Sequence, residues 1–332
     1  MQNLKEILNK GAKFTYVGGK GGVGKTVVAA AIAYYYAGQG QKTLLASLNP
    51  VHSLSSLFDQ DLSGGQIKKV NGAENLYALE VEIEDAVQRY REMVTKRLRE
   101  FLKWAEIPIN PEPFIEIATT NPAFEESAMF DKMMDVMLEQ GKQFDKIVFD
   151  TAAVANAVRL IGLSKIYGLW LNRMIESRKS ALSLREKLSF RKDKVKEEIK
   201  KDPMLLDLIQ LNEKFNAARK FIVDPSYTRF FFVTLPLSLP ISVVVRFINM
   251  VKAFDIPVGG VFVNGIISKS DAERDASGYL KSKYNEQLHY LDIIHKELGP
   301  LVIGYIPQYS NEIVGINMLK KTVEDMLTYI PE

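Results

Sequence analysis

The sequence predicts an α/β fold in which a mostly parallel central sheet is flanked by helices and carries an inserted α-helical subdomain. Short apolar runs rich in β-branched and aromatic residues recur along the chain, they alternate with helical patterns, and two long charged stretches between them are helical in pattern. Strands that are buried on both faces and separated by helices are typical of parallel sheets. The expected strands are Phe14–Val17, Thr43–Leu48, Lys146–Phe149, Phe230–Thr234, Val258–Val263 and Leu301–Ile306.

The helical stretches interrupt the α/β pattern twice. We assign residues 84–121 and 164–224 to the helical subdomain, because they are charged and rich in Leu and Met. Residues 1–83, 142–163 and 225–332 then form the α/β domain. Residues 122–141 place Met129, Met133 and Met137 on one helical stripe and lead into the next strand, so we expect this helix to pack on the α/β domain.

Composition excludes several classes of protein. The 332 residues include 43 Lys and Arg, 40 Asp and Glu and no Cys, and the net charge of +3 gives no basis for a nucleic-acid surface. Without Cys there is no disulfide, no thiolate zinc site and no Cys-ligated iron–sulfur cluster. The longest charge-free apolar run, Phe230–Val245, contains two prolines and is too short to span a bilayer. We therefore expect a soluble, cytoplasmic protein.

The strongest motif is the segment GKGGVGKT, residues 19–26, which satisfies the phosphate-loop pattern G-x-x-x-x-G-K-[ST]. An expected strand precedes it and a helical run follows, so its backbone N–H groups can converge on a phosphate. Lys25 would reach the β- and γ-phosphates and Thr26 would bind Mg²⁺. The sequence therefore predicts a P-loop NTPase for ATP or GTP, whose nucleotide-binding residues include Gly19, Lys20, Gly21, Gly22, Val23, Gly24, Lys25, Thr26 and Val27.

Lys20 is a second lysine in this loop, in addition to Lys25. With GKGGVGKT the chain resembles the deviant Walker A ATPases, a family of dimeric ATPases that includes ArsA, MinD, ParA and the nitrogenase iron protein. In those relatives the signature lysine crosses the dimer interface to the nucleotide of the other subunit. The resemblance thus implies a homodimer in which Lys20 has that catalytic role. The nitrogenase branch needs cluster-binding cysteines, which this chain lacks.

Further segments resemble one branch of this family, the arsenical-pump and tail-anchored-protein-targeting ATPases. Residues 47–58, SLNPVHSLSSLF, resemble its first switch, and residues 147–152, IVFDTA, resemble its Walker B strand. Asp150 ends that strand, where it would hold Mg²⁺ through a water molecule. Asn264 and Pro307 match the positions that flank adenine. The resemblance covers about the whole chain and implies ATP and Mg²⁺ as ligands, whereas no zinc is expected without the paired cysteines that clamp some targeting ATPases.

Asn49 departs from the first-switch pattern, which has an Asp at this position to activate the attacking water. An amide has a similar shape but is not a useful base, and loss of a general base typically removes about 10²- to 10⁴-fold in rate. We therefore expect slow or blocked ATP hydrolysis with ATP binding retained, giving an ATP-trapped, closed form. Either a naturally slow relative or an engineered Asp→Asn change explains this residue.

The resemblance also assigns a role to the helical subdomain. It implies a hydrophobic groove, shared across the dimer, that shields the transmembrane helix of a tail-anchored protein, and it implies a membrane receptor. Mutual packing of the helices is the simpler explanation of any one of these apolar residues. An ArsA-like pump subunit, or another ATP-gated switch with a soluble partner, is the alternative function. The expected groove residues are Val94, Leu98, Phe101, Trp170, Leu171, Met174, Leu208 and Leu211.

Overall fold

The computed structural model describes residues 4–49, 53–104, 110, 112–119, 122–151, 169, 172–184, 187 and 202–331. The chain forms two compact units. One comprises residues 1–82, 139–158 and 221–332, and we call it the sheet unit. The other comprises residues 83–138 and 159–220, and we call it the helical unit.

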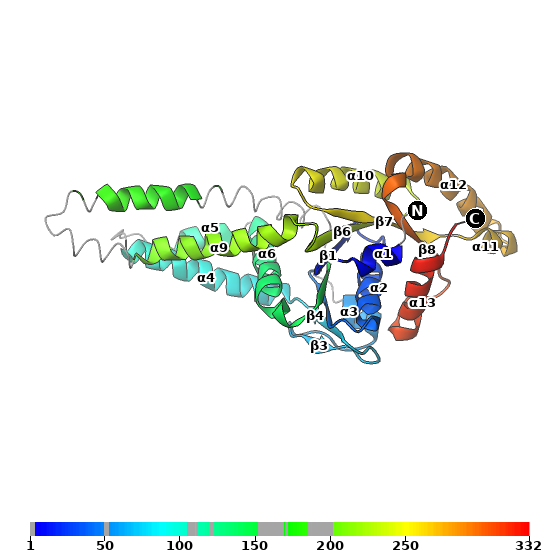
Figure 1. Cartoon of the computed structure of the whole chain (residues 1–332), viewed down its shortest axis with the longest axis horizontal. Helices are drawn as coiled ribbons and strands as arrows, with labels where there is room; N and C mark the ends of the chain where they lie inside the picture. Colours follow the sequence, from blue (N-terminus) through cyan, green and yellow to red (C-terminus); the bar gives the residue numbers. More distant parts are fainter. Residues whose placement is uncertain are drawn as a thin grey trace. The chain divides into compact units, whose positions relative to one another are not determined.

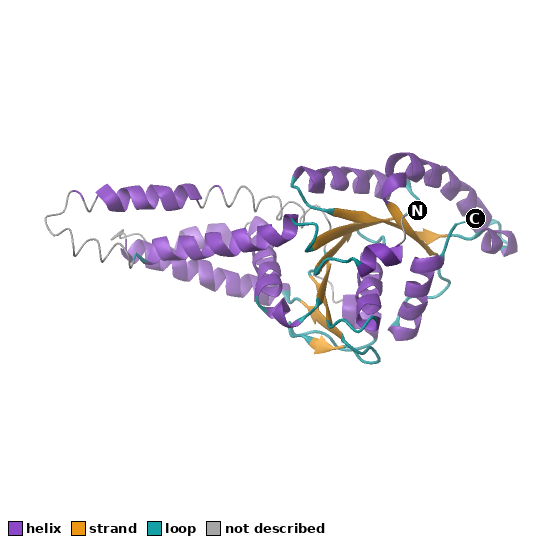
Figure 2. Ribbon diagram, viewed as in Figure 1, coloured by secondary structure: helices purple, strands orange, loops and turns teal. Residues whose placement is uncertain are grey.

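An eight-stranded sheet forms the centre of the sheet unit (Figure 2). Its order is β3-β4-β2-β5-β1-β6-β7-β8, and all neighbours are parallel except β3 and β4. The predicted α/β fold with a mostly parallel sheet is confirmed. The strands are Phe14–Gly19 (β1), Thr43–Ser47 (β2), Lys68–Lys69 (β3), Leu76–Glu80 (β4), Lys146–Asp150 (β5), Thr228–Thr234 (β6), Val258–Ile266 (β7) and Val302–Pro307 (β8).

Each expected strand is present, but β3 and β4 were not expected. β3 has only two residues, which is too short for a periodic pattern. β4 ends at Glu80, and the acidic residues that follow it make the segment look like the start of the next helix. β4 nevertheless pairs with β2 over its whole length, with Ser47 opposite Glu80.

The side chains of the central strands fill cores on both faces of the sheet. On one face the ring of Tyr16 stacks on those of Phe149 and Phe230, with centroids 4.9 and 5.8 Å apart. Because side chains alternate along a strand, the neighbouring Val17 and Phe231 point to the opposite face. There they join a large apolar core that includes the alanine-rich helix α2.

Helices cover both of these faces (Figure 1). α2 and α13 pack together on the face of Val17, whereas α10 lies over the opposite face with α12 beside it. The short helix α1 also joins the core on the α2 side. The helices are Leu4–Asn9 (α1), Lys25–Gly38 (α2), Ser53–Phe58 (α3), Ser238–Ala253 (α10), Lys269–Arg274 (α11), Tyr279–Leu298 (α12) and Gly315–Thr328 (α13), with 3-10 turns at Gln140–Gln143 and Gly299–Leu301.

The helical unit is built from long helices that charged pairs join. Arg97 of α4 contacts Asp207 of α9 at 2.9 Å. Arg178 contacts the buried Asp202, just before α9, at 2.8 Å. Within the described ranges, no helix is long and apolar enough to cross a bilayer. The labelled helices are Ile83–Trp104 (α4), Glu112–Thr119 (α5), Pro122–Leu138 (α6) and Pro203–Val223 (α9), and residues 172–184 are also helical.

Helix α6 corrects one expectation. We expected residues 122–141 to pack on the α/β domain, but Pro122–Leu138 belongs to the helical unit. The reason lies in its partners: the ring of Phe124 packs on Tyr90 of α4, and the ring of Phe130 packs on Phe215 of α9. Lys214 of α9 also reaches two carboxylates of α6, those of Asp131 and Asp135, at 2.7 Å each.

Candidate nucleotide-binding site

The carboxyl ends of the parallel strands meet at one edge of the sheet, and the candidate site lies there. The register places Asp150 opposite Val17 on one side and opposite Ser47 on the other. The glycine-rich loop begins at Gly19, the last residue of β1, and the first switch begins at Ser47, the last residue of β2. Segments more than a hundred residues apart in sequence therefore share one edge, where ligands bind in open α/β sheets.

The phosphate loop depends on glycine at its tightest points. Gly22 and Gly24 have φ angles of 79° and 92°, which residues with a side chain rarely adopt. α2 begins at Lys25, directly after Gly24, so its N-terminus and its unpaired N–H groups face the loop. Val23 is only 1% exposed and anchors the loop in the apolar core.

Lys25, Thr26 and Asp150 lie together beneath this loop. The Lys25 ammonium donates to the carbonyl oxygen of Lys20 at 3.1 Å, and the Thr26 hydroxyl donates to Asp150 at 2.7 Å. Burial raises the pKa of Asp150 to about 6, while the Thr26 hydroxyl and the nearby Lys25 oppose that rise. Burial likewise lowers the pKa of Lys25, against the attraction of Asp150.

This arrangement fits a magnesium ion that is shared with phosphates. Among the described residues, the Oδ1 atom of Asp150 is buried without a hydrogen-bond partner, so it can accept from a metal-bound water. No group of three or more His, Cys, Asp and Glu residues suited to a metal occurs in the described part of the chain. Mg²⁺ typically uses one or two protein oxygens and takes its remaining ligands from phosphates and water. The Thr26 hydroxyl could supply such an oxygen directly, and Asp150 could hold a metal-bound water.

Lys20 is half-buried in the loop. Its ammonium group makes no salt bridge to a described residue. The backbone carbonyl of Lys20 accepts the hydrogen bond from the Lys25 ammonium, as noted above. The two lysines therefore differ in role: the Lys25 side chain binds within the loop, whereas the Lys20 side chain is available for another contact. Val27 lies in the first turn of α2, partly buried against the core.

The first switch is held from two sides. The N–H of Asn49 donates to the Ser47 hydroxyl at 3.3 Å, and the N–H of Leu48 donates to the carbonyl oxygen of Asp150 at 2.9 Å. Residues 50–52 lie outside the described residues. On their far side, Glu80 accepts the N–H groups of Leu54 and Ser55, at 2.7 and 3.1 Å.

Glu80 is a site residue that sequence reasoning missed. It is 2% exposed, and it also accepts the Ser55 hydroxyl at 2.5 Å, so it fixes the helix that follows the first switch. The available signal was a carboxylate at the end of an apolar run, LYALE, which is the same signal that identified Asp150. It went unused because β4 itself was not expected.

Asn264 and Pro307 lie at the ends of neighbouring strands β7 and β8, where Ile266 pairs with Pro307. The Asn264 amide donates to the carbonyl oxygen of Val23 at 2.9 Å, so the structure brings Asn264 to the phosphate loop. Beyond these strand ends lies a hollow of about 620 Å³. Its lining includes Ile267, Arg274, Gln308, Tyr309 and Lys321.

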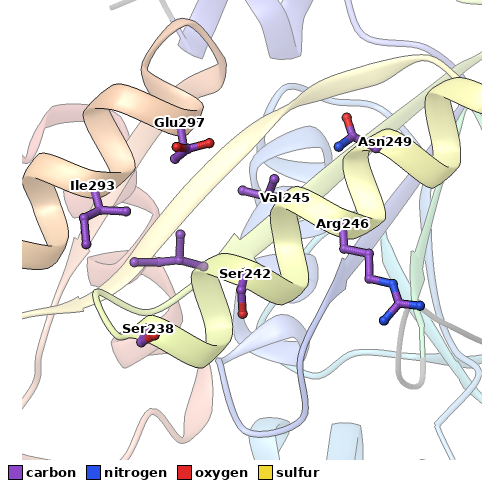
Figure 3. Close-up of a pocket in the computed structure, with 8 residues that line it drawn as sticks. Ser238, Ser242, Val245, Arg246, Asn249, Ile293 and Glu297 are labelled. Atoms are coloured by element: carbon purple, nitrogen blue, oxygen red, sulfur yellow. The ribbon is translucent and has the colours of Figure 1, made fainter.

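A separate hollow of about 530 Å³ lies between α10 and α12 (Figure 3). Its lining comes entirely from these two helices, and it contains none of the loop or strand-end residues described above. In Figure 3, Ser238, Ser242 and Val245 lie along α10, and Ile293 and Glu297 lie on α12. This hollow lacks the phosphate-binding features of the sheet edge.

Three of the eight expected groove residues of the helical unit, Met174, Leu208 and Leu211, pack in one apolar cluster. Leu208 is 8% exposed and packs with Ile175. Met174 and Leu211 are half-buried against the same cluster, and Val94 and Leu98 are half-buried on α4. Trp170, Leu171 and the side chain of Phe101 lie outside the described residues. For Leu208, mutual packing of the helices, the alternative explanation of these apolar residues, therefore applies.

Other apolar side chains of the helical unit are open to solvent, and the sequence did not single them out. Ile117 of α5 is 72% exposed, and Leu206 of α9 is 47% exposed. Leu169 and Leu184, around the helical residues 172–184, are 61% and 58% exposed. No periodic stripe marks these residues, because they lie on the faces that helix packing leaves uncovered.

The glycine-rich strand–loop–helix, its lysine and threonine, and the carboxylate on the neighbouring strand define an ATPase of the P-loop class. Residues 12–328 match the sequence model of the anion-transporting ATPase family, and the chain belongs to that family.

Curated relatives support this membership. The ATPase GET3C of Arabidopsis thaliana is 31% identical over 323 residues, covering 93% of this chain and 80% of the relative. A protein of Aquifex aeolicus, named provisionally as arsenical pump-driving ATPase 2, is 28% identical over 306 residues, covering 92% and 96%. The ATPase GET3 of Lachancea thermotolerans is 26% identical over 326 residues, covering 96% and 91%. The names thus include two kinds of ATPase.

Proposed function

We propose that this protein is an ATP-dependent dimeric targeting factor that binds the hydrophobic transmembrane segment of tail-anchored membrane proteins. Capture and release of the segment are coupled to ATP binding and hydrolysis. The observation that carries this proposal is the set of exposed apolar side chains on the helical unit, Ile117, Leu169, Leu184 and Leu206. An apolar partner that covered these side chains would remove their surface from water, which is favourable.

The sheet unit supplies the nucleotide chemistry of this proposal. The loop N–H groups and Lys25 bind the phosphates of ATP, and the Thr26 hydroxyl and Asp150 hold Mg²⁺, Asp150 through water. Bound Mg²⁺ neutralises phosphate charge. On binding, the Lys25 ammonium exchanges the carbonyl oxygen of Lys20 for phosphate oxygens, which are stronger acceptors. Asn264 and Pro307 flank adenine at the ends of β7 and β8.

Asn49 makes hydrolysis slow in this proposal. The backbone N–H of Asn49 donates to the hydroxyl of Ser47, which lies opposite Asp150 in the sheet. Asn49 therefore lies just after the carboxyl end of β2, at the edge of the sheet that carries the phosphate loop. An amide can hold a water molecule by hydrogen bonds, but it does not take up the proton that water loses on attack. ATP binding does not require that proton transfer, so the closed, ATP-bound state is long-lived.

The proposed assembly is a homodimer that acts in the cytoplasm and meets a membrane receptor. Lys20, which has no salt bridge to a described residue of its own chain, contacts the nucleotide of the partner. Neither zinc nor nucleic acid has a role in this proposal, because the sequence has no Cys and a net charge of only +3. The dimer is therefore held by nucleotide, Lys20 and apolar packing.

A pump-driving ATPase is the second candidate, and the Aquifex aeolicus relative favours it. The absence of Cys from the sequence counts against the part of that function that would use a thiolate site for arsenite. A pump subunit would also need a membrane partner, but its function would not require exposed apolar side chains on the helical unit. The two candidates therefore differ in what the helical unit binds.

Capture of a tail-anchored protein tests the proposal. The full chain is incubated with ATP, Mg²⁺ and a tail-anchored protein made in a cell-free system, and the complex is isolated. We expect capture that depends on ATP and falls about tenfold in Ile117→Asp, since a charge now faces the apolar segment. Ile330→Asp is the matched control, because Ile330 is 69% exposed but lies in the sheet unit. No capture by a chain that still binds ATP would contradict the proposal.

A further inference from the structure

The side chain of Asn264 is bound to the phosphate loop, although the two are 241 residues apart in sequence. Its Nδ2 atom donates to the carbonyl oxygen of Val23 at 2.9 Å. The next residue, Gly24, touches the same amide, since a Cβ atom built there would lie 2.3 Å from Nδ2. Gly24 therefore requires glycine for two reasons. Its φ of 92° is one that other residues rarely adopt, and the Asn264 amide leaves no room for a side chain.

The bond to Val23 controls the direction of the loop's next N–H group. The chain has no cis peptide in its described part, and in a planar trans peptide the C=O and N–H point in opposite directions. Holding the Val23 carbonyl toward β7 therefore turns the Gly24 N–H away from β7. The Gly24 N–H is then not directed at β7 and can take part in an anion-binding set of successive loop N–H groups.

The remainder of the loop is braced by packing. The Val23 side chain is 1% exposed in the core, and a Cβ at Gly19 would lie 2.4 Å from the carbonyl oxygen of Val233 and 2.9 Å from the side chain of Val23. Packing of this kind fixes the position of the loop, but it does not fix the rotation of the peptide between Val23 and Gly24. A hydrogen bond to the carbonyl does.

We propose that Asn264 is a positioning residue that clamps the phosphate loop in its phosphate-binding conformation, before and independently of any contact with a base. The inference rests on the nucleotide binding proposed above and extends it to a step without nucleotide. An asparagine amide has two N–H groups and one oxygen. One N–H is used on Val23, so the oxygen and the second N–H remain for a base.

The first test uses hydrogen–deuterium exchange of the full chain without nucleotide. In Asn264→Ala we expect the amides of residues 19–26 to exchange about three to ten times faster, the factor that corresponds to one lost hydrogen bond. Asn264→Asp should have at least this effect, because a carboxylate cannot donate to the Val23 carbonyl and repels it. Asn249→Ala, an exposed asparagine on α10, is the matched control and should leave these amides unchanged.

Unchanged exchange of residues 19–26 in both Asn264 variants would overturn the clamp. The peptide covering β6, residues 228–234, serves as the folding reference in each variant. Asn264→Asp is nearly isosteric, so it keeps the test decisive where the alanine variant folds poorly. Since no nucleotide is present, this result does not depend on whether the proposed function is correct.

The second test separates clamping from base reading with inorganic tripolyphosphate, which has phosphates and no base. With Mg²⁺ present, we expect Asn264→Ala to weaken binding of tripolyphosphate and of ATP about three- to tenfold, measured by calorimetry. Weakened ATP binding with unchanged tripolyphosphate binding would show that Asn264 only reads the base, and would overturn the clamp. If the unaltered chain bound neither ligand, the proposed function would fail, and the exchange experiment would still decide the clamp.

Discussion

The hydroxyl of Thr26 donates a 2.7 Å hydrogen bond to Asp150, a residue 124 positions further along the chain. The parallel pairing of β1 and β5 makes this contact possible, since it sets Asp150 opposite Val17, just before the phosphate loop. Each residue is a familiar ligand of Mg²⁺ in P-loop ATPases. Because they contact each other directly, the fold brings these two residues of the proposed metal site together before any metal binds.

Burial of Asp150 predicts a pH-dependent stability. Its pKa is about 6 in the folded chain, above the ordinary value of 3.8, so the folded state binds the proton more tightly than the unfolded state. The stabilisation is complete only well below the ordinary pKa of 3.8 and is lost as the pH rises through 6, by an amount of about 3 kcal/mol. Urea unfolding at several pH values, without nucleotide and Mg²⁺, measures it.

Asp150→Asn isolates this effect, because an amide does not titrate. The difference in the free energy of unfolding between the unaltered chain and Asp150→Asn should fall by about 3 kcal/mol from pH 3 to pH 7. A difference that stays constant over this range would show that Asp150 has an ordinary pKa in the folded chain.

Replacing Asn49 by Asp restores the side chain that the first switch has in the family resemblance. We expect ATP turnover to rise about 10²- to 10⁴-fold, because a carboxylate can accept the proton of the attacking water. ATP affinity should change little. A phosphate-release assay measures the rate, and equal turnover in the two forms would rule out this account of Asn49.

Glu80 should stabilise the fold around the first switch. Glu80→Ala leaves the N–H groups of Leu54 and Ser55 without their acceptor, and we expect a loss of about 2 kcal/mol in the free energy of unfolding. In the Asn49→Asp background it should also lower ATP turnover, because the segment that carries residue 49 is no longer held at its far end.

Glu74→Ala is the matched control for Glu80, since Glu74 is an exposed glutamate just before β4. Its stability should stay within about 0.5 kcal/mol of the unaltered chain. Equal stability of Glu74→Ala and Glu80→Ala in urea unfolding would refute the anchoring role of Glu80.

Leu208 and Leu206 should respond differently to truncation, although they lie only two residues apart on α9. Leu208 is 8% exposed and packs with Ile175, so Leu208→Ala should cost about 2–4 kcal/mol in the free energy of unfolding. Leu206 is 47% exposed, so Leu206→Ala should cost less than about 0.5 kcal/mol. In a capture assay we expect the opposite order of effects. Leu206→Ala should weaken binding of the tail-anchored protein more than Leu208→Ala does, while its stability is unchanged. Similar costs for both would mean that Leu208 is not part of a packed core.

The sequence predicted what local patterns encode. The strands that are buried on both faces are continuous apolar runs, so most of the sheet could be predicted. The spacing of glycine, lysine and threonine in GKGGVGKT is specific to phosphate loops, so this loop could be predicted as well. β4 could not be separated from the acidic start of α4, and with it Glu80 was lost. The contact between Asn264 and Val23 depends on the order of strands in the sheet, which no local pattern contains.

Packing partners were the other source of error. The apolar stripe of α6 could pack on either a sheet or other helices. Only the folded structure shows that the α6 rings of Phe124 and Phe130 pack on Tyr90 and Phe215. The apolar stripes of the helical unit likewise could not show which residues face a neighbour. Leu208 lay on an expected stripe and is buried, whereas Ile117 lay on none and is exposed.

The most direct test of the central claim, ATP-dependent binding of a transmembrane segment by the helical unit, is site-specific photocrosslinking. A photoreactive amino acid replaces Ile117 in one form of the full chain and Ile330 in another. With ATP, Mg²⁺ and a tail-anchored protein, we expect crosslinks to its transmembrane segment from position 117, none from position 330, and loss of the crosslink when ATP is omitted. No crosslink from position 117 in a chain that binds ATP, or equal crosslinking from both positions, would contradict this claim.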